Sequence, residues 1–306
     1  MLKSLNHPAA RRTGFTLVEM LMVLALFGLV AAATMQIIVR QQRFYTSAAE
    51  MMSVHANLRD VAAVVPTDLR GISSIGGDIY AMSDSAIDFR LSTGITVICS
   101  IAVTRLSVVI PPTTLASRSA LTTLIGTPNT GDTAFVYDEG ATSQVNDDSW
   151  QRVAVVDTLA AGNCPTYTSS AAEAAMAKTI AIGTVLNANV VPGSVIRFYR
   201  RAKYKLYQPT AGGPWYIGYM DCPGGVCGGM QAVAGPYMPY SATASSTGLR
   251  FVYRDSTGAE TATPANVARI DVTARAQTTN PVRMPGRPED YFRDSLVVSV
   301  ALRNRS

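Results

Sequence analysis

A run of apolar residues near the N-terminus constrains this chain more than any other feature. Residues 15–39 read FTLVEMLMVLALFGLVAAATMQIIV and carry one formal charge, that of Glu19. As a helix they would extend roughly 37 Å at about 1.5 Å per residue, which is enough to cross a hydrocarbon core of about 30 Å. A carboxylate near the centre of a bilayer costs roughly 2.5–3.5 kcal/mol. The sequence therefore predicts a membrane-spanning helix in which Glu19 has a specific task.

The residues before this run orient it. Lys3, Arg11 and Arg12 precede Gly14, and no acidic residue does. The flank of a membrane-spanning helix that carries more Lys and Arg stays in the cytoplasm, so we expect a single-pass inner-membrane protein with its C-terminal part outside. An uncleaved anchor is one interpretation. A secretory signal peptide cleaved after Ala33 is another.

The charge distribution argues against nucleic-acid binding. The chain has 306 residues, with 26 Lys and Arg against 21 Asp and Glu. Three of these cations lie in the N-terminal segment, which leaves 23 against 21 elsewhere, without any Lys- and Arg-rich block. Clustered cations are the electrostatic footprint of a nucleic-acid site. We therefore expect no nucleic-acid partner.

The stretch GFTLVEM at residues 14–20 resembles the N-terminus of type IV prepilins and pseudopilins. In that family a membrane peptidase cuts after the glycine and then N-methylates the new N-terminal residue. The resemblance implies that residues 1–14 are a leader peptide, that the cut falls between Gly14 and Phe15, and that Phe15 is methylated. Prepilin peptidase/N-methyltransferase would then be a partner.

The resemblance also gives Glu19 its task. Cleavage would create an ammonium group on Phe15, one helical turn away, and a charge in lipid is tolerated when it is paired. In the family this carboxylate attracts the N-terminal amine of a neighbouring subunit; pairing within one chain is the alternative. Many major pilins have a proline where this chain has Gln36, so the helix loosening associated with that proline is not expected here.

The helix is expected to continue past the bilayer as an amphipathic half, residues 40–70. Pro66 should kink it or end it nearby. His55 is interpreted as a packing residue rather than a catalytic one, and Met51 and Met52 as core. The predicted buried stripe steps by three, four or seven residues, as one helix face does: Ile38, Tyr45, Ala48, Met52, His55, Leu58, Ala62 and Val65.

Residues 71–306 read as a periplasmic β-rich globular domain, because their apolar residues recur with a period of two. The fold class is therefore α+β, with a long helix packed on a mostly antiparallel sheet. Residues 86–101 are expected to form a hairpin turning at Thr93-Gly94. Segments near 111–131 and 160–193 are rich in small and polar residues and suggest surface insertions. The cations at 200–203 are interpreted as a solvated edge strand.

All four cysteines follow the apolar run, and in an oxidising compartment they could form two disulfides by any of three connectivities. The loop CPGGVC could join Cys222 to Cys227, which would leave Cys99 with Cys164. Free buried thiols are the alternative. Structural zinc is disfavoured because the chain has no CxxC pair.

Sequence motifs of enzymes are absent. No GxSxG, Walker loop, HExxH or GxGxxG string occurs, so we expect no catalytic activity and no cofactor. An acidic loop at residues 138–149 offers weak calcium candidates, although its spacing fits no defined calcium loop. These candidates are Asp138, Glu139, Asp147 and Asp148.

The region after the helix resembles J-type minor pseudopilins of type II secretion and the related W-type minor pilins. This resemblance implies a structural subunit that assembles through its helix with major and minor pilins or pseudopilins, on an inner-membrane assembly platform. The alternative functions are a pilus-displayed adhesin or DNA-uptake module, and a secreted β-rich protein released after Ala33. The likeness lies in DLRG at 68–71, YKLYQ at 204–208, WYIGY at 215–219, GLRFVYRD at 248–255 and VALRN at 300–304.

Overall fold

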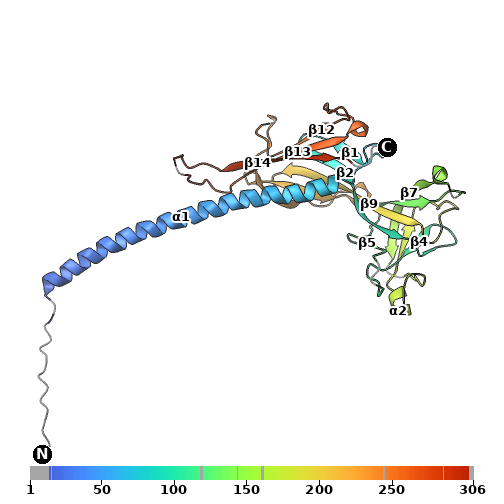
Figure 1. The fold of residues 1–306 in the computed structure, drawn as a ribbon, viewed down its shortest axis with the longest axis horizontal. Helices are drawn as coiled ribbons and strands as arrows, with labels where there is room; N and C mark the ends of the chain where they lie inside the picture. Colours follow the sequence, from blue (N-terminus) through green and yellow to red (C-terminus); the bar gives the residue numbers. More distant parts are fainter. Residues whose placement is uncertain are drawn as a thin grey trace, which may run out of the picture.

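One long helix carries two β-lobes at its C-terminal end (Figure 1). The computed structural model describes residues 14, 16–117, 120–142, 144–159, 162–243, 245–284 and 286–302. The predicted α+β class, a long N-terminal helix followed by a mostly antiparallel sheet, is confirmed. The elements are α1 (Leu17–Leu69), β1 (Ile79–Met82), β2 (Ala86–Val97), β3 (Ser100–Ile101), β4 (Ser107–Ile110), β5 (Thr123–Leu124), β6 (Thr133–Asp138), β7 (Ser149–Leu159), α2 (Ala171–Ala174), β8 (Lys178–Ile182), β9 (Val195–Tyr207), β10 (Trp215–Asp221), β11 (Gln231–Tyr237), β12 (Leu249–Arg254), β13 (Arg269–Gln277) and β14 (Arg293–Ala301), with short 3₁₀ turns at Val145–Asp147, Pro223–Gly225 and Pro264–Asn266.

The helix α1 runs unbroken for 53 residues. Pro66 lies in its last turn, and the backbone N–H of Arg70 closes that turn on the carbonyl of Pro66 at 3.0 Å. Proline removes one helical hydrogen bond and disfavours continuation. The helix therefore ends at Leu69, close to the proline, as the sequence predicted.

The first lobe lies against the C-terminal third of α1. Its strands follow the order β12-β13-β11-β10-β9, with β14 added to the free side of β13 and β1 to β2. β9 and β10 form the antiparallel hairpin expected from the sequence. One apolar core joins helix and strands; its largest buried side chains include Leu69, Phe89, Tyr204 and Tyr237.

The second lobe is distal to the helix and has its own core. Its strands follow the order β9-β6-β7-β8-β4-β3. Buried Ile110, Val136, Ile180 and Phe198 come from four different strands and fill its interior. Part of the segment that the sequence suggested to be an insertion, residues 160–193, is integral to this lobe, because β8 lies between β7 and β4. The many small and polar residues of the 160–193 segment obscured the alternation of Ile180 and Ile182, the two side chains with which β8 packs into the core.

Two long strands, β2 and β9, belong to both lobes. They pair along their whole length, from Ala86 opposite Lys205 to Val97 opposite Val195. The expectation of a hairpin turn at Thr93-Gly94 is wrong: the chain passes straight through as one strand with a register shift between Ser92 and Gly94. Gly94 has φ +149°, and a Cβ there would overlap the carbonyl oxygen of Thr123 in β5. The glycine thus marks a bulge where another strand approaches.

The expectation of a solvated edge for residues 200–203 is also wrong. β9 is an interior strand, and two of its cations form ion pairs near the join of the lobes. Arg200 pairs with buried Asp132 at 2.7 Å and Arg201 with buried Asp88 at 2.7 Å. The hydrogen bonds that both arginines donate to these carboxylates raise the pKa of their guanidinium groups, so both remain charged.

Candidate assembly site

The helix α1 begins with a capping box that includes Glu19. Thr16 is the N-cap, and its Oγ1 accepts a hydrogen bond from the backbone N–H of Glu19 at 3.3 Å. In return Glu19 Oε2 accepts from the backbone N–H of Thr16 at 3.4 Å. This reciprocal arrangement satisfies two N–H groups that a helix start leaves free. The sequence contains this T-x-x-E pattern, although the prediction for Glu19 concerns charge pairing and not capping.

Glu19 is therefore held at the very start of the helix, three residues after Thr16. Gly14 is described and exposed, whereas Phe15 and residues 1–13, including the predicted leader cations, lie outside the described residues. The carboxylate sits within one turn of the predicted cleavage point in sequence. Its placement allows two uses, as a helix cap and as a partner for an ammonium group.

The apolar half of α1 is almost entirely exposed in the part of the chain that the structure describes. The α1 helix is long and apolar enough to cross a membrane, and none of its most apolar window is buried in the protein. Thr34 donates its hydroxyl hydrogen to the carbonyl of Val30 at 2.8 Å, so this polar group is satisfied within the helix, as a lipid environment requires. The helix continues through Gln36 without a break.

The amphipathic half of α1 is buried against the sheet over a shorter length than predicted. The residues buried against the first lobe start at Val54 and recur every three or four positions to Leu69. Tyr45 and Met52, which were expected on this stripe, are about 70% exposed. The lobe reaches only part of the amphipathic half. The buried stripe consists of Val54, Leu58, Val61, Val65, Pro66 and Leu69.

His55 lies beside this stripe and remains half exposed. Its Nε2 is 3.3 Å from Asp294 of β14, and its ring meets the edge of Phe292 at a centroid distance of 5.9 Å. These contacts join helix to sheet. His55 is therefore not on the buried stripe where the sequence pattern placed it.

Two tyrosines fix the soluble half of α1 to the sheet. Buried Tyr237 donates to the carbonyl of Asn57 at 2.8 Å, and Tyr204 donates to Asp68 at 2.5 Å. Burial raises the pKa of Asp68, although the hydrogen bond from Tyr204 lowers it in part. Burial also raises the pKa of Tyr204, so its hydroxyl remains a donor at physiological pH. Sequence reasoning missed this pair because it depends on contact between distant segments.

We expect Asp68→Asn to change how stability depends on pH. The folded-state pKa of Asp68 lies above its usual value of 3.8, so the folded state binds more protons in the window just above that value. Stability then falls as pH rises through this window. In Asp68→Asn this part of the slope should disappear, while Tyr204 keeps an amide oxygen as acceptor. Denaturant unfolding between pH 4 and 7 measures it; an unchanged slope would contradict the assignment.

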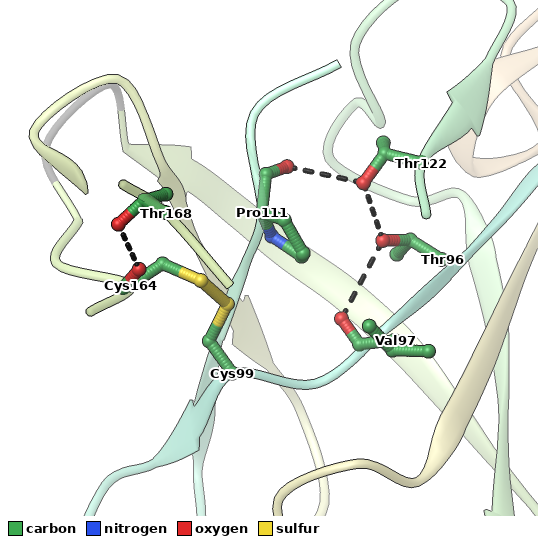
Figure 2. The surroundings of a disulfide bond; sticks show 7 residues. All are labelled: Thr96, Val97, Cys99, Pro111, Thr122, Cys164 and Thr168. Atoms are coloured by element: carbon green, nitrogen blue, oxygen red, sulfur yellow. Dashed lines mark hydrogen bonds between the residues drawn. A yellow bond between two sulfur atoms is a disulfide. The ribbon is translucent and has the colours of Figure 1, made fainter. Parts of the chain in front are cut away.

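The structure joins Cys99 to Cys164 and Cys222 to Cys227. Figure 2 shows the first bond, which ties the end of β2 to the segment before α2, with a Cα separation of 5.4 Å. Cys99, Cys164 and Ala177 form a small buried cluster of their own. This bond therefore holds an irregular part of the distal lobe in place.

Threonine hydroxyl groups near the Cys99–Cys164 disulfide form further hydrogen bonds. Thr96 and Thr122 share a buried hydroxyl–hydroxyl bond of 2.7 Å, and Thr122 donates to the carbonyl of Pro111 at 3.2 Å (Figure 2). Thr168 donates to the carbonyl of Cys164 at 2.6 Å. Thr122 and Pro111 are thus linked to Thr96 of β2 by hydrogen bonds. The second disulfide, in contrast, closes a six-residue turn.

Three of the four calcium candidates accept hydrogen bonds from protein groups. Asp138 accepts from the Asn187 side chain at 2.7 Å. Bonds from Thr142 lower the pKa of Asp147, and the bond from Tyr137 to Asp148 raises the pKa of that tyrosine to about 12. Glu139 is exposed. Among the described residues, no group of three His, Cys, Asp or Glu side chains is placed to hold a metal ion.

Comparison with known proteins agrees with the N-terminal arrangement. Residues 9–35 match the family model for the prokaryotic N-terminal methylation motif. No curated protein and no solved structure matches the chain.

The matched segment covers Gly14, Phe15 and Glu19 and continues into the exposed apolar helix. It supports a type IV pilin-like protein with a membrane-anchoring helix, and it implies processing by prepilin peptidase and assembly with other pilins in general.

Proposed function

We propose that the protein is a minor pilin or pseudopilin, held in the inner membrane by residues 15–39 until it enters a type IV pilus or a type II secretion pseudopilus. The leading support is the methylation motif at the start of a helix that continues unbroken into a β-rich domain. The cations of the leader favour a cytoplasmic N-terminus and a periplasmic domain.

In this function the apolar half of α1 has two successive environments. Its side chains are exposed in the single chain, so lipid covers them before assembly and neighbouring subunit helices cover them afterwards. Within the fibre, a priming or tip-proximal position is proposed from the likeness to J-type and W-type subunits. The distal lobe then projects from the helix and is free to meet other components.

The decisive experiment is the mass of the mature N-terminus from the native host. We expect a chain that begins at N-methylated Phe15, and Gly14→Val should retain the leader. Gly28→Val is the matched control, since a Cβ at either glycine has no neighbouring atom within 4 Å. A chain that begins at Thr34 would instead establish secretion after Ala33, and an untrimmed wild-type chain would overturn the proposal.

A further inference from the structure

Cations and aromatic rings surround α1 where its uncharged part ends. Arg40 and Arg43 are the first charges after Glu19, and both are exposed. Phe44 and Tyr45 follow directly, are about 70% exposed, and contact each other at a centroid distance of 6.0 Å. Aromatic and cationic side chains gather where membrane-spanning helices enter the headgroup region.

The loop between β13 and β14, residues 278–292, of which 278–284 and 286–292 are described, reaches the same level of the helix (Figure 1). Glu50 of α1 accepts hydrogen bonds from the backbone of Thr279 and the side chain of Asn280, both at 2.9 Å. Val282 and Asp290 form a bridge across the loop. The loop and helix line one groove, formed by Val39, Gln42, Arg43, Thr46, Ser47, Pro281, Arg283 and Glu289.

This loop adds two further cations, Arg283 and Arg287, which are exposed. Together with Arg40 and Arg43 they form no ion pair among the described residues.

The acidic groups nearby balance this charge only in part. Glu50 is engaged by the loop, and Asp290 lies 3.5 Å from Arg293. Glu289 is exposed in the groove. The face at this level is therefore net positive.

We propose that these six residues, named here the basic collar, dock on the headgroups of anionic phospholipids while the subunit is in the membrane. The collar comprises Arg40, Arg43, Phe44, Tyr45, Arg283 and Arg287. This inference rests on the membrane anchoring in the proposed function.

Position and charge both favour this partner. Residues 17–39 span about 35 Å as a helix, so the collar lies where a hydrocarbon core of about 30 Å ends. Cations near an anionic membrane surface are attracted to it, and the attraction is lost beyond a Debye length. Docking at two places, the helix and the 278–292 loop, sets the height of the β-lobes above the membrane.

Hydrogen exchange of the 278–292 loop in lipid nanodiscs tests the proposal. The full-length chain is reconstituted in phosphatidylcholine alone and in its mixture with phosphatidylglycerol. The backbone N–H groups of Val282, Arg287 and Asp290 donate hydrogen bonds within the loop and serve as reporters. We expect about tenfold slower exchange in the anionic discs, and no such difference for Arg283→Glu/Arg287→Glu. Arg59→Glu/Lys205→Glu, which changes two exposed cations elsewhere, should behave as wild type.

Equal exchange in both lipids, or slowing that survives the charge reversal, would overturn headgroup docking and leave the loop as packing on α1. Slowing that requires another pilin rather than anionic lipid would assign the collar to a subunit interface. Failure of the chain to enter the nanodisc is recognised earlier, by size-exclusion chromatography, and would contradict membrane anchoring itself.

Discussion

Replacement of Glu19 by alanine is expected to leave cleavage after Gly14 intact and to lower incorporation into filaments at least tenfold. The carboxylate is the lone formal charge in residues 15–39, and loss of one ionic partner for the Phe15 ammonium removes its compensation in an apolar environment. A tenfold change corresponds to about 1.4 kcal/mol. The measurement is the fraction of methylated chain recovered in sheared filaments from the native host.

Glu19→Gln separates the two uses of this side chain. Glutamine also completes a capping box, because its amide oxygen accepts from the N-cap backbone, but it carries no charge. If charge pairing drives assembly, Glu19→Gln fails as severely as Glu19→Ala. Assembly of Glu19→Gln at the wild-type level would show that the capping bonds with Thr16 are what matter.

Removal of the Cys99–Cys164 disulfide by double serine substitution should lower the free energy of unfolding by about 4 kcal/mol, from the entropy of a loop with 65 residues of separation. The Cys222–Cys227 bond spans 5 residues, so its removal should cost only about 2 kcal/mol. The matched pair of variants thus controls for the loss of sulfur itself.

Denaturant unfolding of the full chain in detergent measures these differences. Trp150 in β7 reports on the distal lobe and Trp215 in β10 on the lobe beside the helix, so single-tryptophan backgrounds assign the loss. Equal destabilisation by the two double variants would contradict the loop-length argument, as would an effect of the first variant confined to Trp215.

Local sequence patterns correctly predicted the elements that do not depend on contacts with distant parts of the chain. The continuous α1 and its end near Pro66 follow from composition and from the chemistry of one residue. The β9–β10 hairpin follows from alternation on either side of a Gly- and Pro-containing turn. The motif around Gly14 and Glu19 was equally readable, because it is contiguous in sequence.

Features set by distant contacts were not predictable in this way. A glycine that turns a hairpin and one that accommodates a bulge look alike in sequence, so the sequence predicts a turn at Gly94 where the structure has β5 beside a bulged strand. Arg200 and Arg201 seemed suited to an edge because their partners, Asp132 and Asp88, lie 68 and 113 residues away. The exposed Met52 shows the same limit, since a helix stripe cannot reveal where the sheet beneath it ends.

The two shared strands, β2 and β9, have a mechanical consequence under the proposed function, in which a subunit is extracted from the membrane into a filament. β2 and β9 pair continuously, from Ala86 opposite Lys205 to Val97 opposite Val195. The two lobes are therefore connected by paired strands rather than by a flexible linker. A force along these strands acts on all their interstrand hydrogen bonds at once, in shear, instead of breaking the bonds one after another. The distal lobe should therefore move together with α1 and the first lobe as one rigid unit.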